Sequence, residues 1–166
     1  MEESKISLII AIIALLTALF ALLQKNKPQS EANANDNFLT KPLRLQAYER
    51  LVLLAERIAL PNLISRLSQP GLSAREMQYL LIESVKQEYE YNASQQIYVS
   101  EAAWDAVRSL RDQNLLMINS IAKTLPADAT AGELNKRLME AMIQEEKAAI
   151  HTYAANTLNA EAKKIM

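Results

Sequence analysis

Residues 6–23 form an uninterrupted apolar run, ISLIIAIIALLTALFALL, that contains no charged residue, glycine or proline. At about 1.5 Å per residue, a helix over this run spans about 27 Å, close to the hydrocarbon thickness of a bilayer. A helix also satisfies its backbone hydrogen bonds internally, as a lipid environment requires. The run therefore predicts a single transmembrane helix, preceded by a short N-terminal flank at residues 1–5.

A cleaved signal peptide is the alternative for this segment, but it needs a basic start and a small-x-small cleavage site. The flank MEESK is not basic, and the apolar run passes directly into the polar sequence QKNK. Lys25 and Lys27 follow the run, whereas Lys5 alone precedes it. The excess of positive charge after the run favours an outside N-terminus and a cytoplasmic remainder.

The chain after the anchor divides by composition. Residues 24–42, QKNKPQSEANANDNFLTKP, are polar and rich in asparagine. Such a stretch buries too little apolar surface to offset the loss of chain entropy, so we expect a flexible tether. Residues 43–166 are long enough for one ordinary core, and we expect them to form the soluble domain.

The whole chain has only two glycines, Gly71 and Gly132, which disfavours folds built from many tight turns and favours long helices. We therefore predict an all-α domain, a compact bundle of about four helices with a long C-terminal helix. The expected helices lie at about 43–59, 74–93, 101–124 and 131–164, with a short helical piece at 61–68.

Side-chain caps mark three of these helix starts. Ser73 with Glu76 and Thr130 with Glu133 have the spacing of a capping box, and Ser100 is the expected N-cap of the third helix. An unbroken fourth helix would be about 50 Å long, so its last third would project past the others or pair with another chain. The connection at 94–99 is expected to be an ordered extended loop.

The composition argues against several classes of function. The net charge of −1 offers no basic excess for nucleic acid. The chain has no cysteine and one histidine, His151, which removes most zinc sites and most histidine-based catalysis. A di-metal carboxylate site needs two Glu-x-x-His pairs, so it cannot be built here. We expect no enzymatic activity, no metal and no cofactor.

The first candidate site is an interaction face on the first helix of the domain. Five consecutive apolar residues at 51–55 cover more than one helical turn, whereas a surface helix normally shows a narrower stripe. Such a helix is either covered all round within the domain or exposes one side to a partner, and both alternatives stay open. The candidate residues are Leu51, Val52, Leu53, Leu54, Glu49, Arg50, Glu56 and Arg57.

The second candidate site is rich in tyrosine, a residue with an apolar body and a polar tip that favours interfaces. It could be a helix end packed on the domain, or the edge of a pocket for a small ligand or a lipid headgroup. The candidate residues are Tyr89, Tyr91, Tyr98 and Trp104.

Two stretches, YERLVLLAERIALPNLISRL at 48–67 and SQQIYVSEAAWDAV at 94–107, give the chain a family resemblance. Together with the apolar run, they resemble an uncharacterised family of small single-pass membrane proteins from Bacteroidota. The resemblance implies a helical protein anchored in a bacterial inner membrane, and it implies no substrate.

The leading expectation for function is a membrane-tethered, non-catalytic interaction or scaffold module that binds a protein partner or a second copy of itself. The alternative is a membrane-anchored sensor of a small ligand or lipid headgroup at the tyrosine-rich turn.

Overall fold

The computed structural model describes residues 31–144 and 148–166. The chain divides into two compact units, Met1–Leu39 and Thr40–Met166. In the described residues every regular element is a helix, as predicted. The elements are α2 (Glu31–Ile58), α3 (Leu60–Leu67), α4 (Ala74–Tyr91), the 3₁₀-helix η1 (Ala93–Ile97), α5 (Glu101–Ala122), α6 (Ala131–Gln144) and α7 (Ala148–Ile165).

The predicted membrane anchor at 6–23 lies outside the described residues. Among the helices that are described, none is long and apolar enough to cross a membrane.

Helix α2 is longer than the sequence predicted, because it begins at Glu31 rather than near residue 43. The second half of the expected tether is therefore helical, and Pro42 stands inside the helix. The polar composition of this stretch indicates only that it buries little apolar surface, and it does not decide whether the backbone is helical. A helix that is already packed can extend at its end without burial, because each added residue contributes a backbone hydrogen bond.

The predicted caps are present. The Ser73 hydroxyl accepts from the backbone N–H of Glu76, whose carboxylate accepts from the N–H of Ser73, 2.8 Å away. Thr130 and Glu133 make the same reciprocal pair at the start of α6. The Ser100 hydroxyl accepts from the third N–H of α5. In both capping boxes, hydrogen bonds from the serine or threonine lower the pKa of the glutamate.

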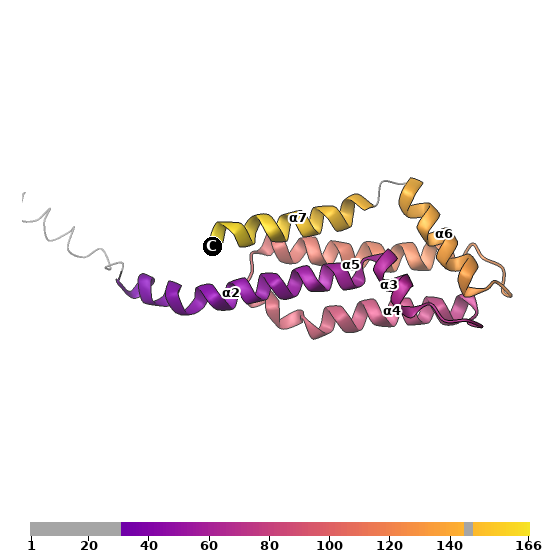
Figure 1. The fold of residues 1–166 in the computed structure, drawn as a ribbon, viewed down its shortest axis with the longest axis horizontal. Coiled ribbons are helices and arrows are strands. Elements are labelled where there is room, and N and C mark those ends of the chain that lie inside the picture. The colour runs from indigo at the N-terminus through magenta and orange to yellow at the C-terminus, as the bar shows by residue number, and fades with distance from the viewer. Residues whose placement is uncertain (1–30, 145–147) are drawn as a thin grey trace, which may run out of the picture. The chain divides into compact units, whose positions relative to one another are not determined.

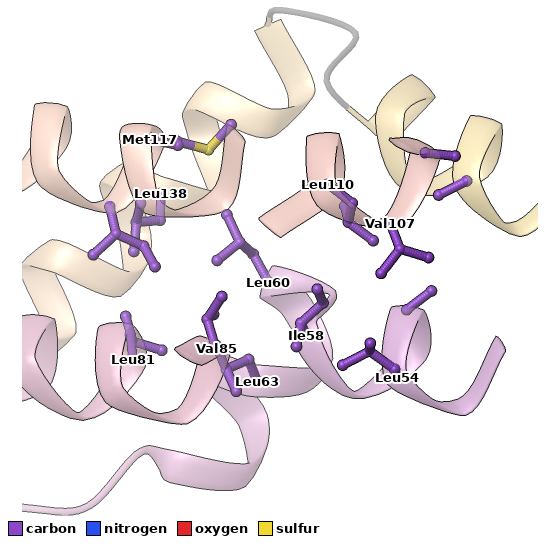
Figure 2. Close-up of a cluster of buried hydrophobic side chains, with 14 of the residues drawn as sticks. Leu54, Ile58, Leu60, Leu63, Leu81, Val85, Val107, Leu110, Met117 and Leu138 are labelled. Atoms are coloured by element: carbon purple, nitrogen blue, oxygen red, sulfur yellow. The ribbon is translucent and has the colours of Figure 1, made fainter. Parts of the chain in front are cut away.

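The core lies where α5 contacts α4 on one side and α7 on another, while α6 lies across one end against α4 and α5 (Figure 1). Figure 2 shows the buried side chains of α2, α3, α4, α5 and α6 meeting in one cluster. Its labelled members are Leu54, Ile58, Leu60, Leu63, Leu81, Val85, Val107, Leu110, Met117 and Leu138.

The predicted single helix at 131–164 is wrong. The structure contains two helices, with α6 ending at Gln144 and α7 beginning at Ala148. Helix α7 does not project from the domain but packs along α5 (Figure 1). Ala154 and Leu158, four residues apart on one face of α7, are fully buried. Folding back covers these side chains, which a projecting helix would leave in water.

The predicted extended loop at 94–99 is also wrong, since Ala93–Ile97 form the 3₁₀-helix η1. Asn92 explains the difference. Its side-chain amide donates to the carbonyl of Glu88 at 2.9 Å, and its own carbonyl accepts from the N–H of Gln95 at 3.0 Å. These local bonds continue the helical turn instead of opening it.

Candidate functional site

The apolar run at 51–55 is divided between the core and the surface. Leu51, Leu54 and Ala55 are buried, and Val52 is half-buried against the core. Leu53 is 61% exposed. Residues at i, i+3 and i+4 share a helix face, so the buried members form the core stripe and Leu53 lies away from it. The core interpretation therefore holds for most of the run, and one leucine is left facing solvent.

Leu53 lies on a face of α2 that runs beside the last turns of α4. Arg50 and Arg57 share this face with Leu53 through their i, i+3 and i+7 spacing. The guanidinium of Arg50 lies over the ring of Tyr91, 5.4 Å from its centroid. The Nε of Arg57 donates to the Glu88 carboxylate at 2.7 Å. These five residues, Arg50, Leu53, Arg57, Glu88 and Tyr91, are called the α2–α4 surface.

The α2–α4 surface combines parts of both candidate sites, because Tyr91 belonged to the tyrosine-rich region. Tyr91 is 74% exposed, so its ring and Leu53 are the open apolar groups of this surface. Glu49 is exposed and makes no hydrogen bond or ion pair with a described residue. Glu56 is directed elsewhere, because its carboxylate lies beside Asn62 and His151.

The remaining aromatic candidates do not form one group. The rings of Tyr89 and Trp104 stack with centroids 5.1 Å apart, and the Arg111 guanidinium lies 4.1 Å from the Tyr89 centroid. Burial raises the pKa of the Tyr89 hydroxyl, and the positive charge of Arg111 acts in the opposite direction. Tyr98 lies at the surface, after η1. The arrangement suits a packed helix end, one of the alternatives left open by the sequence.

A hydrogen-bonded cluster that the sequence did not reveal joins three helices. The hydroxyl of Tyr48 in α2 donates to the Glu161 carboxylate in α7 at 2.7 Å and accepts from the N–H of Ser100 at 3.2 Å. The Ser100 hydroxyl also donates to Glu161. Burial raises the pKa of Glu161, but these hydrogen bonds and the positive charges of Lys164 and Arg44 together outweigh it and hold the pKa below the usual 4.5. The same burial and the nearby carboxylate raise the pKa of Tyr48.

The Tyr48–Ser100–Glu161 cluster fastens α2, the start of α5 and α7 to one another. Ser100 already caps α5, so its hydroxyl serves the helix end and the tertiary contact together. No local signal could have found the cluster, because its members are 52 to 113 residues apart. Within the described part of the chain, no group of three or more His, Cys, Asp or Glu side chains could hold a metal ion.

The described residues thus define a small all-helical protein that carries an exposed surface of arginine, leucine and tyrosine. The chain belongs to a family of unknown function (DUF7935), whose match covers residues 4–165 and so includes the apolar run. No curated protein and no solved structure matches the chain.

Proposed function

We propose that this protein is a membrane-tethered, non-catalytic module that binds a protein partner through the α2–α4 surface. The observation that carries the proposal is the exposed pair of Leu53 on α2 and Tyr91 on α4, which lie beside Arg50 and Arg57 of α2. Tyrosine and arginine are among the residues enriched at the energetic centres of protein interfaces.

The surface is ordered before a partner arrives, which favours binding. The Arg57–Glu88 ion pair and the Arg50–Tyr91 contact each join α2 to α4. Side chains that are already held in place lose less conformational entropy when they are covered. Leu53, between the two arginines on the helix, then supplies apolar area for a partner to cover.

The anchor and orientation in this proposal come from the sequence. Residues 6–23 would hold the protein in a bacterial inner membrane, with the domain on the cytoplasmic side. Tethering raises the local concentration of the surface for any partner at the same membrane. A weak individual contact would then suffice for function.

Site-specific photo-crosslinking in cells tests the proposal. A benzophenone amino acid replaces Leu53 in one variant and Leu116, on α5, in the control. The two leucines are matched in exposure, at 61% and 60%. We expect a discrete crosslinked protein from position 53 and none from position 116.

In a third variant, the benzophenone amino acid replaces Tyr91. Adding the substitution Leu53→Glu to this variant should abolish its crosslink while the domain stays folded, because Leu53 is not part of the core. A crosslink to the same partner from position 116, or no crosslink from position 53 in membranes that contain the protein, would contradict the proposal. A crosslink between two copies of this chain would identify self-association as the form the interaction takes.

A further inference from the structure

A cavity of about 310 Å³ opens beside the core, and no residue of the α2–α4 surface lines it. Its apolar wall is formed by Leu60 of α3 with Leu110 and Met117 of α5, which Figure 2 shows in the same part of the core. All three are buried. An apolar cavity of about 150 Å³ in a protein can hold one benzene ring. The cavity here therefore has room for a body of about two fused rings.

The outer edge of the cavity carries the carboxylate of Glu56, which Asn62 holds by hydrogen bonds and which lies beside His151 without a hydrogen bond between them. Nε2 of His151 lies 3.2 Å from Oε1 of Glu56, and Nδ2 of Asn62 donates to Oε2 at 3.3 Å. The same Asn62 amide donates to the backbone carbonyl of Glu56 at 2.9 Å. The Glu56 side chain is 49% exposed, so it lies where the cavity meets solvent. A carboxylate accepts about four hydrogen bonds, which leaves capacity for a ligand.

Two amide side chains on α5 add further acceptors to the wall. Asn114 is only 6% exposed and donates through Nδ2 to the carbonyl of Ile58 at 2.7 Å. Gln113 lies beside it on α5 and also lines the cavity. Nε2 of His151, in the same lining, is buried and has no hydrogen-bond partner in the described part of the chain. A buried polar atom without a partner is costly unless water or a ligand supplies one.

We propose that this cavity binds a small amphiphilic amine, with its apolar body against Leu60, Leu110 and Met117 and its ammonium group at Glu56. The described lining residues include one carboxylate, Glu56, one histidine, His151, and no lysine or arginine, so Glu56 gives the wall a negative charge that an ammonium group can meet. An ammonium group supplies three donors, which match the carboxylate and the side-chain amide oxygens of Gln113 and Asn114. This site is independent of the interaction surface and goes beyond the proposed function.

Methionine methyl NMR of the full-length chain in detergent micelles tests the proposal. Met117 and Met142 line the cavity, whereas Met77 is buried in the core and does not line it, so it serves as the internal control. The probes are tryptamine, indole and indole-3-acetate, which share one bicyclic body and differ in charge. We expect saturable shifts at Met117 and Met142 with tryptamine, and binding weaker by about tenfold or more with indole-3-acetate.

The variant Glu56→Gln removes the charge and keeps the shape of the side chain. It should weaken tryptamine binding by about tenfold while leaving indole unchanged. Glu49→Gln is the matched control, since Glu49 is an exposed glutamate two turns earlier on α2 and does not line the cavity. The proposal is overturned if no probe shifts Met117 and Met142 saturably, if tryptamine and indole-3-acetate bind equally, or if both glutamine variants behave alike. The comparison of the three probes on the unaltered chain tests it even if a variant fails to fold.

Discussion

Leu53 and Leu54 are neighbours on α2. Replacing each by alanine tests which of the two lies on the core face of this helix and which lies on the exposed face. Leu54 is 1% exposed and belongs to the core cluster, whereas Leu53 is 61% exposed. Truncating a buried leucine costs about 2–5 kcal/mol, because the transfer free energy is lost and a cavity remains. We expect about 3 kcal/mol for Leu54→Ala and about 1 kcal/mol or less for Leu53→Ala.

Urea unfolding followed by tryptophan fluorescence measures the difference. Trp104 is the only tryptophan in the chain, and it is buried against Tyr89. With a denaturant slope of about 2 kcal/mol per molar urea, the midpoint should fall by about 1.5 M for Leu54→Ala. For Leu53→Ala it should move by about 0.5 M or less. Equal shifts for the two variants, or a larger shift for Leu53→Ala, would refute this assignment of faces.

Three further predictions concern the polar contacts. Tyr48→Phe should lower the free energy of unfolding by about 1–2 kcal/mol, measured by the same fluorescence assay, because it deletes the hydrogen bond to Glu161. The folded-state pKa of Glu161 lies below 4.5, so its stabilisation is complete above that pH and is lost as the pH falls through the folded-state pKa. Urea midpoints between pH 6 and 3 should therefore fall less steeply for Glu161→Gln than for the unaltered chain, and parallel curves would contradict this. Asn114→Ala should cost about 1–3 kcal/mol, because the buried carbonyl of Ile58 loses its side-chain donor. An unchanged midpoint would show that this bond contributes nothing.

Features that depend on a few neighbouring residues could be read from the sequence. The capping boxes at Ser73 and Thr130 and the cap at Ser100 depend on hydrogen bonds between residues three positions apart, and all three are present. The short helix expected at 61–68 is present as α3, one residue earlier, and Pro61 lies in its first turn, where proline fits a helix. The scarcity of glycine correctly indicated an all-helical fold in the described residues.

Features that depend on distant segments were decided by the tertiary structure. The sequence could not show which side of the 51–55 run faces inward, because five consecutive apolar residues offer every face of the helix. Packing buries Leu54 and leaves Leu53 in solvent. No glycine or proline lies between Gln144 and Ala148 to mark the end of α6, so the return of α7 onto α5 had no local signal.

The same distinction applies to the two candidate sites. Local sequence supplied Arg50, Leu53 and Arg57 as one helix face, but only the packing of α4 on α2 brought Tyr91 beside them. Glu56 and His151 are ninety-five residues apart and meet because α7 folds back. Hydrogen bonds within one turn are fixed by local geometry, whereas burial and the meeting of distant side chains depend on where the other helices lie. The sequence of this protein therefore determined its all-helical class and three of its helix caps, and the tertiary structure determined the division of α6 from α7, the exposed surfaces and the cavity.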